Sequence, residues 1–294
     1  MCARNEDWVL GLSARVALQW CDSLVILDHA STDGTAWMAT ELQHEFPGRV
    51  FVIRLTDPTW EEMRHRQMML EEARRISATH IAIVDCDELL TGNLLGSIRG
   101  HIEASGANML MLPGYNLRGL NLYHSNGVWG NRWFSTAFKD NPQANWAGAG
   151  QHHREPHGIT WGRVKPVKQG DGGVMHLWGA SERRLRAKHA LYKINEILKP
   201  IQDRDYKTLE EIDRVFSWAI KGDVANGYGT PATWTYADVP AEWWEPYRSI
   251  SDQVGFAEIP FPMDHPPWQA ARVRELLKIY GRELFSGLDL FGIA

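Results

Sequence analysis

The sequence predicts an α/β fold in which a mostly parallel sheet is flanked by helices and followed by a C-terminal helical addition. Three observations support this prediction: short apolar runs alternate with amphipathic segments over residues 1–90, those apolar runs are nearly continuous, and helical periodicity dominates the last third. Continuous apolar runs are typical of strands covered on both faces. Alternation of strand and helix is typical of parallel strands joined by right-handed crossovers.

The elements of the first third follow in a regular order. The expected strands are 23–29, 49–55 and 79–85, and the expected helices are 7–20, 31–46 and 57–77. The helix over 31–46 opens with cap-type residues, which satisfy the unpaired N–H groups of a first turn. We therefore expect three strands of one parallel sheet within the first 85 residues.

The rest of the chain is less regular. A helix over 92–105 and a strand over 107–116 are expected, but residues 114–175 lack periodicity and are predicted to form loops and short strands that build a site. The later helices are expected over 181–199, with Ser181 as N-cap, and over 205–220 and 267–286. We expect one domain over 1–200 and a helical, aromatic extension over 201–294 packed on it.

Composition limits the class of protein. The chain is 44% hydrophobic and 23% charged, as expected of a globular protein, and no apolar run approaches the roughly 20 residues of a membrane span. The first residues lack the apolar core of a signal peptide. Cys2, Cys21 and Cys86 are too far apart for a disulfide framework, which favours a cytoplasmic location. A net charge of −5 disfavours nucleic acid as the main partner.

Three acids, Asp85, Asp87 and Glu88, end the apolar run of the third strand. Ligands of parallel α/β sheets bind at the carboxyl ends of strands. In an extended backbone residues i and i+2 point the same way, so Asp85 and Asp87 are expected to face one point. Such a carboxylate pair suits a hard divalent cation, Mg²⁺ or Mn²⁺. The alternative is a solvated loop whose acids cap the next helix.

Two further residues fit a nucleotide site. Asp28 ends the strand over 23–29, where its carboxylate can accept hydrogen bonds from a nucleobase or ribose, while the following residues Ser31, Thr32 and Asp33 cap the next helix. Arg66 lies on the helix before the acid triad, where it could supply charge to a diphosphate. For Arg66, the alternative is a solvated basic helix face.

Three motifs occur in a recognisable order: "RNED" (4–7), "DHASTDGT" (28–35) and "VDCDE" (84–88). Together they resemble the family 2 glycosyltransferases and their relatives with the GT-A, nucleotide-diphospho-sugar transferase fold, a Rossmann-like arrangement. The resemblance covers residues 1–120. It implies a metal-dependent transfer of a sugar from a nucleotide-diphospho-sugar, UDP-linked, to an acceptor hydroxyl with inversion.

The resemblance also implies residue roles. The nucleotide-sugar would be held by Arg4, Glu6, Asp28 and Asp85, and Arg66 is added to them because of its position on the helix before the triad. Asp87 would bind the metal, Mn²⁺ or Mg²⁺. Several branches of the superfamily place a histidine on a strand before a Ser-capped basic helix, and this histidine completes the metal or diphosphate site. That role maps to His176 in "GVMHLWGASERRLRAKHALY"; a hydrogen-bonded core histidine is the alternative.

An inverting transfer also needs a carboxylate that takes the proton of the acceptor hydroxyl. The Glu-Asp pair common in the family is absent here, which leaves two candidates, Glu155 in "QHHREPHG" and Asp171 in "GDGG". Glu155 is favoured because glycines and aromatic residues flank its segment, whereas a turn residue is the alternative for Asp171. The histidines of the first loop suggest zinc, but Pro156 prevents a helix from presenting His153 and His157 together.

The acceptor, a glycan, a small molecule or another hydroxyl carrier, would contact the variable part of the chain. Tryptophans available there for stacking are Trp129, Trp133, Trp146, Trp161, Trp234, Trp243 and Trp244. Three other functions stay open. A nucleotidyltransferase of the same fold is disfavoured because "CARNEDW" lacks a Gly-rich basic loop. A metal-dependent hydrolase would use the histidine-rich loop, and a non-catalytic sugar-binding module would not need the intact acids.

Overall fold

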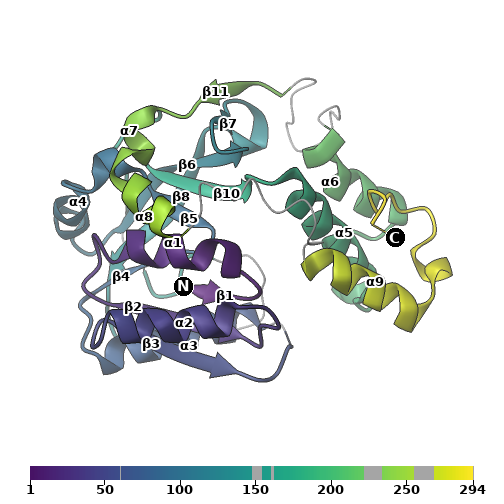
Figure 1. Ribbon diagram of the computed structural model, residues 1–294, viewed down its shortest axis with the longest axis horizontal. Coiled ribbons are helices and arrows are strands. Elements are labelled where there is room, and N and C mark those ends of the chain that lie inside the picture. The colour runs from purple at the N-terminus through teal and green to yellow at the C-terminus, as the bar shows by residue number, and fades with distance from the viewer. Residues whose placement is uncertain (60, 148–153, 160–161, 222–233, 255–267, 294) are drawn as a thin grey trace. The chain divides into compact units, whose positions relative to one another are not determined.

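The computed structural model describes residues 1–59, 61–147, 154–159, 162–221, 234–254 and 268–293 (Figure 1). Contacts group the described chain into two units. The first comprises Met1–Tyr115, Arg132–His176 and Pro240–Ile259, and the second comprises Asn116–Asn131, Leu177–Val239 and Pro260–Ala294. Each unit is described by itself below. The domain boundary expected at residue 200 stays a prediction.

The first unit contains a parallel sheet in the order β1-β2-β3. Its strands are β1 (Cys2–Ala3), β2 (Leu24–His29) and β3 (Val50–Leu55), and the helices between and after them are α1 (Asp7–Ala17), α2 (Thr35–Glu45) and α3 (Glu62–Arg75). Every residue of β2 is buried, as its continuous apolar run predicts. The α/β prediction is thus confirmed.

The third expected strand does not join this sheet. Only β4 (His80–Ala82) forms within 79–85, and it pairs antiparallel with β8 (Arg132–Lys139). The expectation of a third parallel strand is therefore wrong, because an apolar run predicts burial but not the partner strand. β8 itself lies in the region that was expected to be irregular, and its eight residues make it one of the longer strands.

Further strands and helical segments lie wholly or partly in the first unit. β5 (Glu88–Leu90) pairs antiparallel with β10 (Val174–Gly179), and β6 (Met109–Arg118) pairs with both β8 and β9 (Arg163–Val164). The helical segments are η1 (Gly92–Leu94), α4 (Ile98–Ala104), α7 (Ala241–Trp244), η4 (Glu245–Tyr247) and α8 (Arg248–Gln253). The hydroxyl of fully buried Tyr247 donates to the Leu90 carbonyl at 2.7 Å, which fastens η4 to β5.

The second unit is mainly helical. Its elements are β7 (Leu122–His124), η2 (Gly127–Trp129), α5 (Glu182–Leu198), η3 (Ile201–Asp203), α6 (Leu209–Lys221), β11 (Tyr236–Asp238), α9 (Trp268–Tyr280) and η6 (Arg282–Phe285). Ser181 caps α5 as predicted, since its Oγ accepts the Arg184 N–H at 3.3 Å. Apolar residues of α5, α6 and α9 share one core. Over the described residues, no helix combines the length and apolar character that crossing a bilayer requires.

Candidate functional site

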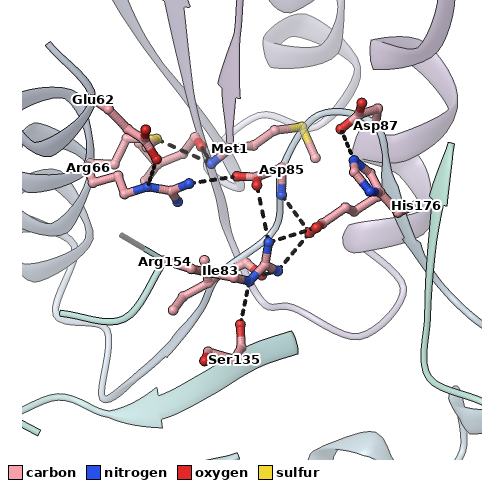
Figure 2. A network of polar contacts seen from close by, with 12 residues as sticks. Met1, Glu62, Arg66, Ile83, Asp85, Asp87, Ser135, Arg154 and His176 are labelled. Atoms are coloured by element: carbon pink, nitrogen blue, oxygen red, sulfur yellow. Dashed lines mark hydrogen bonds and ion pairs between the residues drawn. The ribbon is translucent and has the colours of Figure 1, made fainter. Parts of the chain in front are cut away.

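The acid triad lies on a turn between β4 and β5. The Glu88 N–H donates to the Asp85 carbonyl at 3.0 Å, which closes the turn through Cys86 and Asp87. The rule that residues i and i+2 share a side holds only for extended backbone. The expectation that Asp85 and Asp87 face one point is therefore wrong, and Figure 2 shows the two carboxylates directed to different partners.

Arg154 is the centre of the polar network around this turn (Figure 2). Its Nη1 donates to Asp85 Oδ2 at 3.1 Å and to Glu88 Oε1 at 2.7 Å. Its Nη2 donates to Glu88 Oε2 at 2.7 Å and to the Ile83 carbonyl at 2.8 Å. Its Nε donates to the Ser135 carbonyl at 2.7 Å. All three guanidinium nitrogens are thus engaged, which joins the acid turn, the residue after β4, and β8.

Arg66 on α3 approaches Asp85 from the other side. Its Nη2 lies 3.3 Å from Asp85 Oδ1, and its Nε lies 3.1 Å from Glu62 Oε1. Burial opposes ionisation of Asp85, but the guanidinium groups of Arg66 and Arg154 outweigh it and hold the pKa of Asp85 below its ordinary value. Burial acts to lower the pKa of Arg66, but attraction to Asp85 and Glu62 outweighs burial and raises that pKa above its ordinary value. Asp85 is therefore ionised and neutralised by the protein itself.

The other two residues of the turn have distinct surroundings. Glu88 is 3% exposed, and its Oε2 accepts the Asp85 N–H at 3.0 Å in addition to the bonds from Arg154. It therefore orients the turn and does not face solvent. Cys86 is buried, and burial raises the pKa of its thiol. A buried neutral thiol of this kind serves packing.

Asp87 faces His176. The antiparallel pairing of β5 with β10 sets His176 opposite Glu88, and this register brings His176 Nε2 to 3.5 Å from Asp87 Oδ1 (Figure 2). The Asp87 side chain is 10% exposed and the His176 side chain is 20% exposed. Within the described ranges, no group of three or more His, Cys, Asp or Glu side chains is arranged to hold an ion. A two-residue set suits an ion that takes its other ligands from water or phosphate, as Mg²⁺ does.

The first two motifs meet at the carboxyl ends of β1 and β2. Parallel pairing sets Ala3 opposite Asp28. The Asn5 N–H donates to Ser31 Oγ at 3.0 Å, and the Thr32 N–H donates to Asn5 Oδ1 at 2.6 Å. The segments "RNED" and "DHASTDGT" therefore contact each other, as a shared ligand site requires.

The predicted nucleotide residues lie on these two segments. Asp28 is 4% exposed, and its Oδ1 accepts the Ser31 N–H at 3.3 Å. Glu6 is buried and accepts the indole N–H of Trp8. Arg4 Nη1 donates to the Pro58 carbonyl at 2.6 Å, which brings in the segment that follows β3. The structure thus gathers Arg4, Glu6 and Asp28 at one end of the parallel sheet.

The two candidate bases lie in different settings. Glu155 accepts from Ser135 Oγ at 2.6 Å and from Arg163 Nη2 at 2.8 Å, and its side chain is 32% exposed. Asp171 is exposed and ends a turn in which its N–H donates to the Lys168 carbonyl at 3.1 Å. This is the geometry of a turn residue. The role of base stays a prediction for both.

The structure describes only some of the loop histidines and of the tryptophans named from the sequence. His152, His153 and Trp161 lie outside the described residues, and His157 is exposed. Three of the seven tryptophans are packed in cores, since Trp146, Trp234 and Trp243 are 5%, 8% and 1% exposed.

Sequence reasoning missed Arg154. A signal was available: three acids close together in sequence need more positive charge than Arg66 alone supplies. The partner could not be chosen from sequence, because Arg154 lies 69 residues from Asp85.

No protein-family model matches this chain, and no curated protein matches it. Among solved structures, S. aureus TarS 1–349 is similar at 12% identity and a TM-score of 0.42, over 96% of this chain and 80% of that one. The same protein in complex with UDP is similar at 11% identity and a TM-score of 0.42, over 75% and 69% of the two chains. At these values the likeness establishes no function for this chain.

Proposed function

We propose that this chain is a metal-dependent glycosyltransferase that moves a sugar from a UDP-linked donor to an acceptor hydroxyl with inversion. The observation that carries the proposal is the pairing of Asp87 with His176 at 3.5 Å, beside an acid turn whose other carboxylates are already neutralised. The resemblance in the three ordered motifs assigns a diphosphate–metal site to this place in the fold.

Asp87 and His176 are the residues that would hold the divalent ion. One carboxylate oxygen and one imidazole nitrogen form a donor set that Mn²⁺ accepts, with phosphate oxygens of the donor filling further positions. When bound, the ion would stabilise the negative charge that develops on the departing diphosphate. The nucleotide would lie at the ends of β1 and β2, where the buried Asp28 carboxylate can accept hydrogen bonds from the ribose or base.

Glu155 is proposed as the base, with Asp171 as the second candidate. The base takes the proton of the acceptor hydroxyl. At the same time the oxygen of that hydroxyl bonds to the anomeric carbon of the sugar, and the bond from this carbon to the diphosphate breaks. Glu155 would first leave Arg163, whose side chain is 61% exposed. Exposed ion pairs contribute only about 0–1 kcal/mol, so this release costs little.

The test is thermal stabilisation by nucleotides. UDP with Mn²⁺ is expected to raise the Tm, and UDP with EDTA is expected to raise it much less, because a ligand that binds only the folded state stabilises it. GDP and dTDP serve as comparison nucleotides. Absence of a shift with every nucleotide contradicts the proposal.

A variant sharpens this test. Asp87→Asn should remove the Mn²⁺-dependent part of the shift and leave the Tm of the free protein nearly unchanged. Asp22→Asn is the matched control, since the Asp22 side chain is 87% exposed and pairs with Arg99 away from the acid turn. For the base, Glu155→Gln and Asp171→Asn are compared, and the true base is the one whose loss reduces turnover while donor binding persists.

A further inference from the structure

Two side chains of β8 point to the same face of the sheet beside the proposed base. Trp133 and Ser135 pair in regular register with β6, so the strand is extended between them. In extended backbone residues i and i+2 share a side, and each residue advances about 3.4 Å. The Trp133 ring therefore neighbours the Ser135 hydroxyl, which donates to Glu155 Oε1 at 2.6 Å. A ligand on this ring would lie next to the Glu155 carboxylate.

The Trp133 ring carries a cation over its face. Lys165 Nζ lies 4.4 Å from the ring centroid. Trp133 is half-buried and packs in part against the apolar cluster that contains Met111, whereas Lys165 is exposed. A cation–π contact at an exposed site is weak. A ligand that packs closely on the ring can therefore displace the ammonium group from it.

Lys165 also gives this face a positive charge. Glu155, the acid beside the ring, pairs with Arg163 at 2.8 Å. Over the part of the chain that the structure describes, no carboxylate forms an ion pair with Lys165. The electron-rich face of an indole suits the C–H side of a pyranose ring, and an ammonium group beside it suits a carboxylate or a phosphate. The two side chains together fit a sugar that is negatively charged.

We propose that Trp133 and Lys165 form a binding subsite for an acidic sugar. The pyranose ring stacks on Trp133, and the carboxylate or phosphate of the sugar pairs with Lys165, whose ammonium group leaves the ring as the sugar takes its place. Because the subsite adjoins Glu155, the bound sugar is the acceptor of the transfer. This last assignment rests on the proposed function, whereas the binding of the sugar does not.

The experiment is a titration of the protein without nucleotide, followed by saturation-transfer NMR, with three sugars. Methyl β-D-glucuronide and glucose 6-phosphate are acidic, and methyl β-D-glucoside is the neutral comparison. Both acidic sugars should bind about two- to fivefold more tightly than the neutral one, the advantage of one exposed ion pair. This advantage should shrink at high salt, because exposed charges are screened. Equal binding of all three sugars, or binding of none, overturns the inference.

Substitution of the ring tests the stacking. Trp133→Ala should weaken the binding of all three sugars about tenfold, and Trp133→Phe should restore part of it, because it keeps an aromatic face. Trp37→Ala is the matched control, since Trp37 on α2 is 62% exposed and lies on a different sheet. It should bind the sugars as the wild type does. Unchanged sugar binding in Trp133→Ala contradicts the proposal.

A second substitution covers the case in which the Trp133 variants do not fold. Lys165→Ala changes an exposed side chain and should remove the preference for acidic sugars while the neutral glucoside still binds. Lys139→Ala, exposed at the other end of β8, should keep the preference. A preference that persists in Lys165→Ala refutes the role of this lysine and overturns the subsite.

The same proteins separate the sugar subsite from the transferase function. Trp133→Ala and Lys165→Ala should keep the Mn²⁺-dependent rise in Tm with UDP, because neither residue belongs to the proposed nucleotide or metal site. Absence of that rise in the wild-type chain would refute the proposed transfer, and with it the acceptor role, while the sugar titrations would still decide whether the subsite exists.

Discussion

Lys193 in the second unit and Arg154 in the first both pair with carboxylates, but their surroundings differ. Lys193 on α5 is 0% exposed and donates to Asp213 Oδ1 at 2.9 Å and to Ser217 Oγ at 2.8 Å. Arg154 is 17% exposed and donates to the carboxylates of Asp85 and Glu88, of which Asp85 is 37% exposed.

The difference lies in what each cation joins. Lys193 lies in a helical core, where its bonds to Asp213 and Ser217 tie α5 to α6. Arg154 lies at a partly exposed turn and ties that turn to β8. We therefore expect removal of the Lys193 cation to affect stability most.

The largest expected effect is in the closed core. Lys193→Met should lower the free energy of unfolding by about 3–5 kcal/mol, since removal of one partner leaves the carboxylate of a buried pair without its cation. Urea unfolding measures this loss, and Lys278→Met, at an exposed position of α9, is the control. UDP binding per folded molecule should not change. A variant that keeps its stability and loses UDP binding would reverse the comparison.

The next effect depends on pH. Burial lowers the pKa of His189 on α5 to about 4, so the folded protein keeps this imidazole neutral. Between pH 6.5 and about 4 the unfolded chain binds more protons at this site, and stability falls as pH falls, by up to about 1.4 kcal/mol per pH unit. The stability linked to the neutral His189 imidazole is fully present above pH 6.5. In urea unfolding at several pH values, His189→Gln should reduce the fall in stability between pH 6.5 and about 4, whereas the same substitution at exposed His157 should not.

A smaller effect tests the shape of the cation at the acid turn. Arg154→Lys keeps the charge but cannot reproduce a planar fork that reaches Asp85, Glu88 and two carbonyls. We expect a loss of about 2 kcal/mol in urea unfolding, the size of one or two charged hydrogen bonds. Wild-type stability of Arg154→Lys would show that charge suffices and the fork does not matter.

The smallest effect concerns backbone strain at Ala30, close to Asp28. Ala30 follows β2 with φ of 49°, a left-handed conformation that glycine adopts more readily. Ala30→Gly should therefore stabilise the chain by about 0.5–1 kcal/mol. The converse test is Gly48→Ala, where φ is 75° and an added Cβ would contact nothing within 4 Å. The change in unfolding free energy should therefore reflect backbone strain alone. Equal signs for the two substitutions would contradict this explanation.

Sequence information was sufficient wherever the determining interactions are local. The continuous apolar run of β2 predicted full burial, and Ser181 predicted the start of α5. The same reasoning placed Asp28 near the end of a strand, where the structure has it. Each of these inferences needs only neighbours a few residues away.

Sequence information failed where the partner is distant. The apolar run before Asp85 could not reveal that β4 pairs with β8, or that the backbone turns at residues 85–88. It could not select Arg154 either, since many arginines in a chain of this length could balance three acids. Strand pairing and ion pairing are decided by the assembled fold, so they were available only from the structure.

The contribution of Pro240–Ile259 to the first unit limits how the gene can be shortened. Trp243 packs on Tyr115 with ring centroids 4.4 Å apart, and the Tyr247 hydroxyl supplies the hydrogen bond to Leu90. A chain truncated before residue 240 would leave the Leu90 carbonyl without its donor and would uncover β5 (Glu88–Leu90). Expression of the first unit alone therefore requires grafting this late segment back, for example by circular permutation, instead of a stop codon after the sheet.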